Sequence, residues 1–286
     1  MMRISTEIGS AAEFVGERRA VELVGKAGFD AWDLTLFDLA RWDWSRDCIA
    51  ESNHIFTTSE CVKYVRELRN IGEAYGMVCN QSHAPFPTYG MSKDILKRSI
   101  ELTAEAGGDI CIIHPNNCRS AEENAEMYRG ILPFAKEYGV KIATENMWNW
   151  DKGSETSTPA ACSSAESFVK HIDLVGDDFL VGCLDIGHAE MRGSGDGAAK
   201  MIRALGKRLQ ALHIHDNDKL HDSHEIPFSM NIDFVSVTDA LREIGYSGYL
   251  TLESNGYFSD ADADSVEYKL KMLADSARRL DAMMMK

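Results

Sequence analysis

The chain has 286 residues, of which 44% are hydrophobic and 26% charged, a composition typical of a folded globular protein. Its 30 lysines and arginines against 45 aspartates and glutamates give a formal net charge of −15. This charge argues against a nucleic-acid partner, because basic side chains supply most of the affinity for a phosphate backbone.

No stretch of the sequence offers the ~18 uninterrupted apolar residues of a membrane span. The N-terminus, MMRISTEIGS, has no apolar signal core. Seven cysteines are scattered without a C-x-x-C pair, which favours reduced thiols over a disulfide framework or a cysteine zinc site. We therefore expect a cytoplasmic protein that does not enter a membrane.

In chain order, short apolar runs alternate with amphipathic helical stretches, and the pattern repeats eight times. The predicted strands span 2–8, 29–35, 76–82, 109–113, 140–145, 179–185, 209–215 and 248–253, and the predicted helices span 11–26, 58–74, 92–106, 120–138, 162–174, 196–206, 234–244 and 263–281. Eight successive βα units favour a closed parallel sheet, so we predict an α/β fold, a single (β/α)8 TIM barrel forming one domain over residues 1–286. A doubly wound sheet is the alternative, but no G-x-G-x-x-G motif follows the first strand.

Acidic or imidazole side chains end four predicted strands in succession. They are Glu145 after VKIAT, Asp185 after FLVGCL, His213 and His215 in LQALHIHD, and Glu253 after YLTL. Strand C-termini of a parallel barrel converge on one face, so these residues meet in one pocket. Several carboxylates gathered beside an imidazole in one cavity repel one another unless a cation holds them. The pattern therefore predicts a divalent metal site.

Each of these residues also has a plain structural interpretation. Glu145 alone could cap a helix or pair with a basic side chain. Asp185 and His188, three residues apart in LDIGHAEM, could simply share a hydrogen bond. A barrel built for stability alone would place Val or Ile at such strand ends. Four strands in succession that end in this way favour the metal site.

Further polar and aromatic residues belong to the same rim. His83 in SHAPF and His114 in IIHPNN end the third and fourth strands, and Asp222 and His224 occur in HDSHEIPF after the seventh. A single histidine of this kind more often makes a structural hydrogen bond than a metal bond. The tryptophans of NMWNWD, Trp148 and Trp150, either stack on the C–H face of a sugar or pack within their loop.

With these motifs, the chain resembles the xylose-isomerase-like barrel superfamily, which groups sugar (phosphate) isomerases and epimerases with AP-endonuclease barrels. SHAPF, IIHPN, ATEN, CLDIGHAEM, LHIHDND and GYSGYLTLE carry the resemblance in order over nearly the whole chain. For its ketose 3-epimerase branch, the resemblance implies one divalent ion (Mn²⁺, Mg²⁺, Co²⁺ or Zn²⁺) held by Glu145, Asp185, His213 and Glu253. His215 is open as an alternative to His213.

The same resemblance implies roles for the side chains. Glu145 and Glu253 would be the proton-transfer pair, His188 would contact a substrate oxygen, and Asp151 would contact the sugar. His83, His114, Trp148, Asp222 and His224, together with His215, are the remaining candidates for substrate binding. One departure from the epimerase pattern is that no arginine follows LHIHDND closely.

The AP-endonuclease branch uses nine ligands for three zinc ions, and this chain has a fitting residue at each position. They are His83, His114, Glu145, Asp185, His188, His213, Asp222, His224 and Glu253. Under this alternative the protein would be a phosphoester hydrolase with up to three Zn²⁺. The net charge of −15 and the lack of basic loops count against a phosphodiester substrate.

The leading hypothesis is therefore a metal-dependent isomerase or epimerase with a small-molecule sugar or sugar-phosphate substrate, working by proton transfer beside a carbonyl through an enediolate. A related sugar dehydratase or lyase, or a non-catalytic sugar- or partner-binding barrel, is also compatible with these residues. No Gly-rich phosphate cradle follows the last two strands, which favours an unphosphorylated substrate. The sequence leaves the oligomeric state open, and a homo-oligomer is compatible with it.

Overall fold

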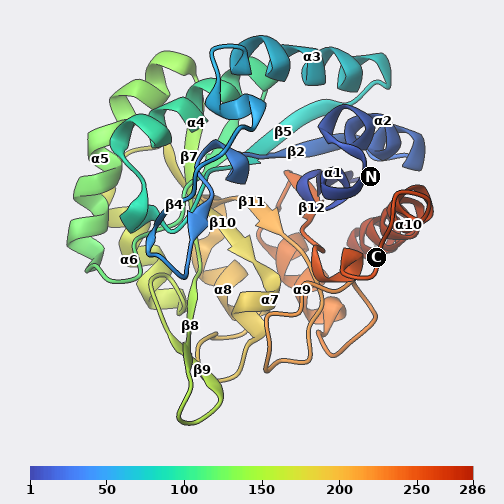
Figure 1. Ribbon diagram of the computed structural model, residues 1–286. Helices are drawn as coiled ribbons and strands as arrows, with labels where there is room; N and C mark the ends of the chain where they lie inside the picture. The colour runs from blue at the N-terminus through green and yellow to red at the C-terminus, as the bar shows by residue number, and fades with distance from the viewer. Residues whose placement is uncertain (286) are drawn as a thin grey trace.

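Eight short runs rich in aliphatic residues form the eight parallel strands of a barrel in the computed structural model, which describes residues 1–285 (Figure 1). These strands are β1 (Arg3–Glu7), β2 (Ala31–Thr35), β5 (Val78–His83), β6 (Ile110–Ile112), β7 (Lys141–Glu145), β10 (Leu180–Asp185), β11 (Leu209–His213) and β12 (Tyr249–Leu252). They pair in the order β11-β10-β7-β6-β5-β2-β1-β12. Ile214 closes the ring, since its N–H donates to the Thr251 carbonyl at 2.9 Å and its carbonyl accepts from Glu253 N at 3.1 Å. The predicted TIM barrel is confirmed.

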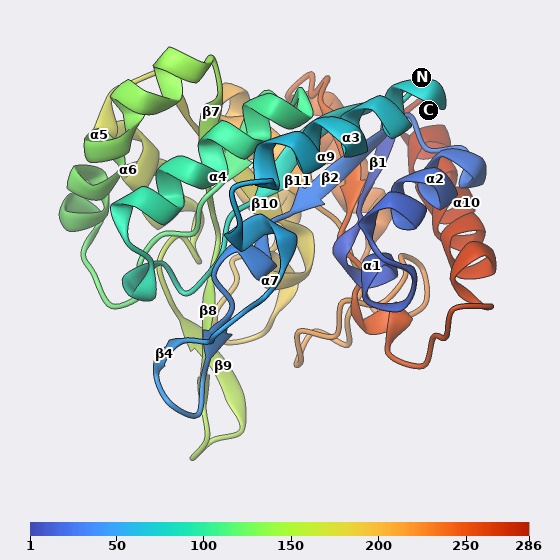
Figure 2. The ribbon, with the colours of Figure 1, turned by 45° about the horizontal axis from the view of Figure 1, so that its top comes forward.

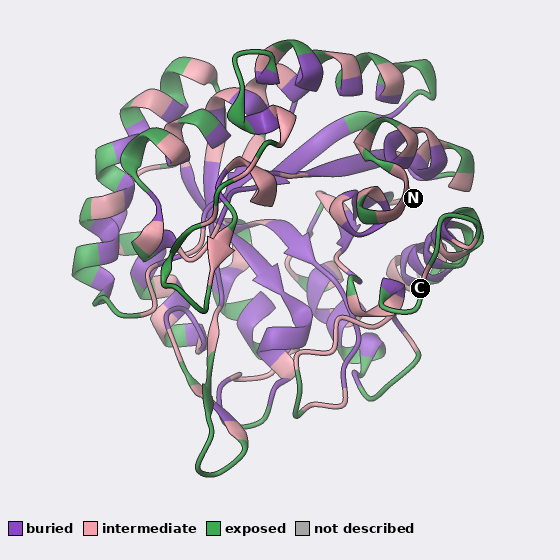
Figure 3. Cartoon of the chain, viewed as in Figure 1, coloured by how far each residue is buried: buried purple, intermediate pink, exposed green. Residues whose placement is uncertain are grey.

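Helices form an outer ring around the strands (Figure 2). They are α1 (Gly9–Val15), α2 (Glu17–Ala27), α3 (Cys61–Ala74), α4 (Lys93–Ala106), α5 (Ala121–Tyr138), α6 (Ala165–Val175), α7 (Ile186–Glu190), α8 (Ala198–Leu205), α9 (Phe234–Glu243) and α10 (Val266–Met284). Buried residues face the barrel and exposed ones face outward (Figure 3). Among these helices, none is both long enough and apolar enough to cross a bilayer.

The structure differs from the sequence prediction mainly in the connections. Gly16, at a φ of +74°, divides the predicted helix 11–26 into α1 and α2, because a residue in this conformation cannot continue a helix. The predicted loops 36–57 and 146–160 contain the antiparallel hairpins β3 (Trp42–Asp43) with β4 (Cys48–Ile49) and β8 (Trp148–Asp151) with β9 (Thr156–Pro159). Asp185 caps α7, which the sequence did not predict, by accepting from His188 N at 2.7 Å.

Five short 3₁₀ segments complete the connections, at Phe37–Leu39, Ile55–Thr57, Thr88–Gly90, Gly206–Arg208 and Gly256–Phe258. The first of them follows β2 directly and brings the Phe37 ring to the His83 ring, with centroids 4.9 Å apart. This segment therefore forms part of the rim at the C-terminal ends of the strands.

The interior of the barrel is built differently on its two sides. One side, formed by the neighbouring strands β6, β7, β10 and β11, is an apolar cluster of Ile112, Ala143, Val181, Cys183 and Ala211. The other, formed by β5, β2, β1 and β12, buries the polar residues Ser5, Asp33, Asn80, Gln81 and Thr251. We call these the apolar half and the polar half of the barrel.

A β-bulge accounts for part of this asymmetry. Trp32 of β2 is opposite Cys79 of β5, but the next residue, Asp33, is opposite Gln81. Asn80 is therefore an extra residue in its strand, and a bulge of this kind redirects side chains that would otherwise alternate. As a result, Asn80 and Gln81 both contact interior polar groups although they are adjacent in sequence.

Candidate metal centre and active site

Glu145, at the end of β7, is the centre of a cluster of imidazoles and is only 1% exposed. Its Oε2 lies 3.2 Å from Nδ1 of His213, 3.4 Å from Nε2 of His114 and 3.7 Å from Nε2 of His83. None of these contacts has the geometry of a hydrogen bond, so this buried oxygen has no hydrogen-bond partner among residues 1–285. Leaving such an atom unpaired is costly unless an additional group satisfies it.

Glu145, Asp185, His213 and Glu253 each direct a ligand atom to a common point. These four atoms lie within 4.8 Å of one another. The Oε2 atom of Glu253 lies 3.3 Å from Nδ1 of His213, on the same side of the ring as Glu145. In the part of the chain that the structure describes, Glu145 Oε2, Asp185 Oδ2 and His213 Nδ1 all lack a hydrogen-bond partner. Carboxylate and imidazole donors suit Mn²⁺, Co²⁺ and Zn²⁺, so the four residues fit a divalent ion.

A second group of potential ligands lies beside the first and shares Asp185 with it. It consists of Asp185, His188, His215 and His224, whose ligand atoms are also within 4.8 Å of one another. Nε2 of His215 is 3.1 Å from Asp185 Oδ1, and the His215 and His224 rings stack with centroids 3.8 Å apart. The two alternative histidines of the sequence therefore belong to different groups, and His213 is the one beside both glutamates.

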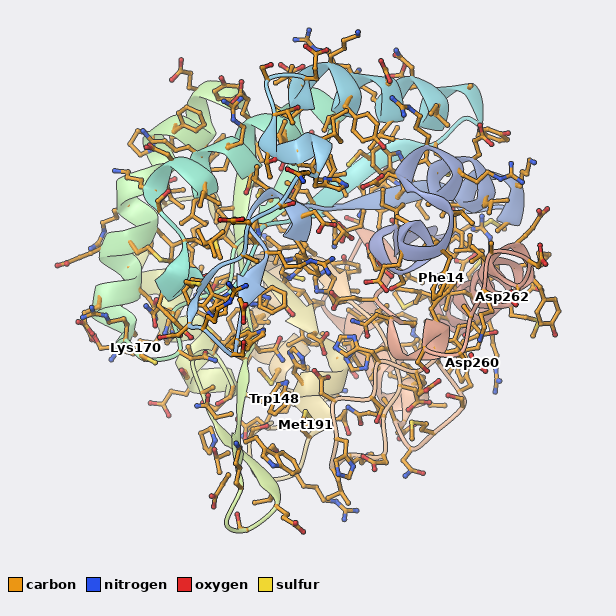
Figure 4. The ribbon with its side chains drawn as sticks, viewed as in Figure 1. Phe14, Trp148, Lys170, Met191, Asp260 and Asp262 are labelled. Atoms are coloured by element: carbon orange, nitrogen blue, oxygen red, sulfur yellow. The ribbon has the colours of Figure 1, made fainter. Side chains whose placement is uncertain are left out.

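Asp222 joins the second group to the aromatic wall of the site. Its Oδ2 lies 3.2 Å from each of three nitrogens, Nε2 of His188, Nε2 of His224 and Nε1 of Trp148. Trp148, labelled in Figure 4, starts the hairpin β8–β9 close to α7. The loop after β11 and the hairpin after β7 are therefore tied together over the pocket.

Backbone carbonyls orient four of the histidines. Nδ1 of His83 faces the Ala84 carbonyl at 2.8 Å, and Nδ1 of His188 faces the Asn146 carbonyl at 2.8 Å. Nδ1 of His224 likewise faces the Glu253 carbonyl at 2.9 Å, and Nδ1 of His215 faces the Asp216 carbonyl at 3.3 Å. A carbonyl can only accept, so Nδ1 carries the hydrogen and Nε2 is directed into the site. This is the usual arrangement around a ligating imidazole.

The carboxylates and imidazoles shift each other's pKa values. Burial alone would raise the pKa of the Glu145 carboxyl, but His213 and His114 hold this pKa well below its ordinary value. Burial also disfavours a charged His224 ring, yet Asp222 raises its pKa to about 10. The carboxylates thus favour positive charge among these residues, and a divalent cation between the same groups supplies it.

A cavity of about 430 Å³ opens above these residues. Glu145, His188 and Glu253 line its inner end, and Phe37, Trp44, Phe86, Tyr89, Trp148 and Trp150 contribute its aromatic walls. Within residues 1–285, no lysine or arginine lines it. His83, His114, Asp222 and His224 also line the cavity, and their contacts with a substrate stay a prediction.

Asp151 is the candidate that the structure places outside both this cavity and the two ligand groups, whereas Asp185, His213 and His215 belong to those groups without lining the cavity. It is exposed in the hairpin β8–β9, where Oδ1 accepts from Gly153 N at 2.9 Å and Oδ2 from the Ser154 hydroxyl at 2.7 Å. The carboxylate thus stabilises its own turn and lies outside the group that surrounds Glu145.

Comparison with known proteins identifies the family. Residues 21–276, most of the chain, match the family model described as "Xylose isomerase-like TIM barrel". The chain belongs to this family. The chain is also 26% identical over 254 residues to the uncharacterized protein MJ1311 of Methanocaldococcus jannaschii, with 82% of this chain and 78% of the relative covered.

Solved structures show the same xylose isomerase-like fold at low sequence identity. A D-tagatose 3-epimerase-like protein superposes with a TM-score of 0.70 and 22% identity, covering 98% of this chain and 99% of the other. An L-ribulose 3-epimerase superposes with a TM-score of 0.71 and 19% identity, covering 100% and 95%. At these identities the likeness establishes the fold.

Two residues of the site escaped the sequence-based prediction for this xylose isomerase-like chain. Asn146 exchanges hydrogen bonds with the backbone of Asp185, at 2.9 Å from its side-chain nitrogen and 2.8 Å to its side-chain oxygen. Asp33, fully buried in β2, lies 3.4 Å from Nε2 of His213. An acid inside the apolar run FDAWDLTLF was the available signal for Asp33, which lies in the middle of its strand, unlike the acids at the ends of the later strands.

Proposed function

We propose that this protein is a divalent-metal-dependent isomerase or epimerase that acts on a sugar by proton transfer beside a carbonyl. The observation that carries the proposal is the convergence of two glutamate carboxylates on one nitrogen of the same imidazole. Glu145 Oε2 and Glu253 Oε2 lie 3.2 and 3.3 Å from Nδ1 of His213. The sugar 3-epimerases among the similar structures support this choice of reaction.

The ion would be held by Glu145, Asp185, His213 and Glu253, and when bound it supplies Lewis-acid stabilisation of negative charge on the substrate oxygens. The two glutamates come from β7 and from the end of β12, on different halves of the barrel. One can remove a proton from one side of the substrate while the other returns a proton from the opposite side. Each such group contributes roughly 10²–10⁴ to the rate.

The remaining side chains would bind and orient the sugar. His188 presents Nε2 at the cavity wall and would contact a substrate hydroxyl, as would His83 and His114. Trp148 and Trp150 offer apolar faces to the C–H side of the ring. We propose an unphosphorylated substrate, because no lysine or arginine of the described residues lines the cavity to bind a phosphate.

The test is exchange of a substrate hydrogen with solvent. The purified protein loaded with Mn²⁺ is incubated with a panel of ketoses in D₂O, and the sugars are examined by NMR and mass spectrometry. We expect deuterium at a carbon beside the carbonyl of at least one sugar, together with a new epimer or isomer. Metal analysis should give one ion per chain. Absence of exchange across the panel with metal bound would contradict the proposal.

A second function is favoured by one specific observation, the second group of ligands around Asp185 and His215. A multinuclear zinc phosphoester hydrolase would use both groups together with His83 and His114. This alternative predicts about three zinc ions per chain, as in the three-zinc members of the superfamily, and cleavage of a duplex that contains an abasic site. Zinc analysis and that cleavage assay on the same preparation separate the two functions.

A further inference from the structure

His213 is oriented differently from the four histidines of the site that face a backbone carbonyl. Its Nδ1 is directed at Glu145 and Glu253, and its Nε2 is directed at the Asp33 carboxylate, with Oδ2 3.4 Å away. Neither ring nitrogen has another partner within the described part of the chain. The distance to Asp33 is longer than the ~2.7–3.2 Å of a well-formed hydrogen bond. Even so, Asp33 is the acceptor that Nε2 faces.

Asp33 is held in place by an amide whose own orientation is fixed. Gln81 donates from Nε2 to Asp33 Oδ2 at 2.8 Å. The Oε1 atom of Gln81 accepts from Asn80 Nδ2 at 3.1 Å and from the Thr251 hydroxyl at 3.4 Å. Since the oxygen end of the amide is occupied by these donors, its nitrogen end has to point toward Asp33.

Further hydrogen bonds connect Asn80 to other buried side chains of the polar half. Oδ1 of Asn80 accepts from the Ser5 hydroxyl at 2.6 Å, and Nδ2 of Asn80 also donates to the Thr251 hydroxyl at 3.1 Å. Ser5, Asn80 and Thr251 are all buried and come from three different strands, β1, β5 and β12. Buried hydrogen bonds of this kind form a rigid network, because no water molecule is available to these groups as an alternative hydrogen-bond partner.

We propose that Asp33 is a positioning residue, which holds the hydrogen of His213 on Nε2 and thereby directs the Nδ1 lone pair at the divalent cation. An ionised carboxylate can only accept, and a hydrogen fixed on Nε2 leaves Nδ1 free as a ligand. Gln81 and Asn80 keep the carboxylate in this position. The inference rests on the proposed metal-dependent function and adds a carboxylate–histidine–metal relay from the polar half of the barrel.

The test measures Mn²⁺ binding by isothermal titration in the wild type and in Asp33→Asn. We expect the affinity to fall by roughly 10–100-fold, the usual cost of removing a carboxylate behind a ligating histidine. Asp33→Glu should recover part of this loss, because it restores an acceptor-only group. The matched control is Asp281→Asn in α10, which also removes a buried carboxylate, one that accepts from Met2 N at 2.6 Å. This control should bind Mn²⁺ as the wild type does.

The absorption spectrum of the Co²⁺-loaded proteins separates positioning from plain structural support. A change in ligand direction alters the d–d bands, so Asp33→Asn should change the spectrum while Asp281→Asn leaves it unchanged. Gln81→Met is a second variant for the case in which Asp33→Asn does not fold. It frees the carboxylate without removing it, and we expect weaker Mn²⁺ binding, between that of the wild type and that of Asp33→Asn.

The outcomes are distinguishable. Wild-type protein that binds no divalent ion would contradict the proposed function. Wild-type protein that binds Mn²⁺, with Asp33→Asn and Gln81→Met equally tight and spectroscopically identical, would overturn the role of Asp33 alone. A loss of unfolding free energy in Asp33→Asn without a change in affinity or spectrum would also overturn it.

Discussion

The apolar and polar halves of the barrel support the same rim in different ways. In the apolar half, the side chains of Ile112, Ala143, Val181, Cys183 and Ala211 fill the space beneath three of the four proposed ligands. In the polar half, hydrogen bonds join the buried side chains of Ser5, Asn80, Gln81, Asp33 and Thr251. Only the fourth ligand, Glu253, comes from that half.

The difference shows how one interior can meet two requirements. An apolar floor excludes water and lowers the local dielectric constant, which strengthens the attraction between the carboxylates and a cation. It orients an imidazole poorly, because it offers only the Cys183 thiol, a weak hydrogen-bonding group. The hydrogen bonds of the polar half fix the orientation of the Asp33 carboxylate, and Asp33 in turn orients the His213 ring from across the barrel. The site combines strong electrostatics from one half with orientation from the other.

The largest effect is expected on turnover, from substitution of the two glutamates that come from different halves of the barrel. If Glu145 and Glu253 share the proton transfer, Glu145→Gln and Glu253→Gln each lower turnover by roughly 10²–10⁴-fold, because an amide cannot exchange the proton. The measurement is the rate of deuterium incorporation, with circular dichroism to verify folding. Glu126→Gln, on the exposed surface of α5, is the control and should keep full activity. Equal activity in all three variants would refute a shared role.

In the apolar half, a truncation should reduce stability and leave the metal site unchanged. Ile112 is fully buried in this half, and Ile112→Ala removes its packing and leaves a cavity. We expect a loss of about 2–5 kcal/mol in the free energy of unfolding. Urea denaturation measures this loss, and Mn²⁺ affinity should remain close to that of the wild type. A large drop in affinity would mean that the apolar half also orients the ligands.

In the polar half, Glu7 at the end of β1 should make stability depend on pH. Burial raises the pKa of its carboxyl to about 7 from an ordinary 4.5. A raised pKa in the folded state favours the protonated form, so this contribution to stability is complete below about pH 4.5 and is lost as the pH rises to about 7. Glu7→Gln should therefore stabilise the protein above pH 7 by up to about 3 kcal/mol.

Thermal or urea denaturation of wild type and Glu7→Gln between pH 4 and pH 8 measures this difference. The two proteins should be similarly stable at pH 4 and diverge with rising pH. A constant difference over the whole range would show that the carboxyl of Glu7 does not retain its proton in the folded state.

The smallest effect is expected from one hydroxyl in the network. Thr251→Val keeps the shape of the side chain but removes a donor to Gln81 Oε1 and an acceptor for Asn80 Nδ2. Leaving these buried groups unpaired should cost about 1–3 kcal/mol. Urea denaturation measures the change, and Thr57→Val, at an exposed position, is the control. An unchanged stability would show that the polar half tolerates a broken hydrogen bond.

The sequence predicted the barrel because strand and helix periodicities repeat in each βα unit, and it predicted the rim because acids and histidines end successive strands. It did not predict the role of Asp33, since one acid within an apolar run also fits a strand with one solvent-exposed face. The bulge at Asn80 has no sequence signal of its own, so the pairing of Gln81 with Asp33 is visible only in the folded structure. The position of Asp151 similarly depends on how the hairpin β8–β9 projects.

The contacts that orient the imidazole rings limit which positions of the site can change independently among homologues. His83, His188, His215 and His224 take their ring directions from main-chain carbonyls, which every amino acid provides. Neighbouring side chains can therefore be substituted without changing the orientation of these rings. His213 takes its direction from the side chain of Asp33, so we expect positions 33 and 213 to be retained or exchanged together over evolutionary time.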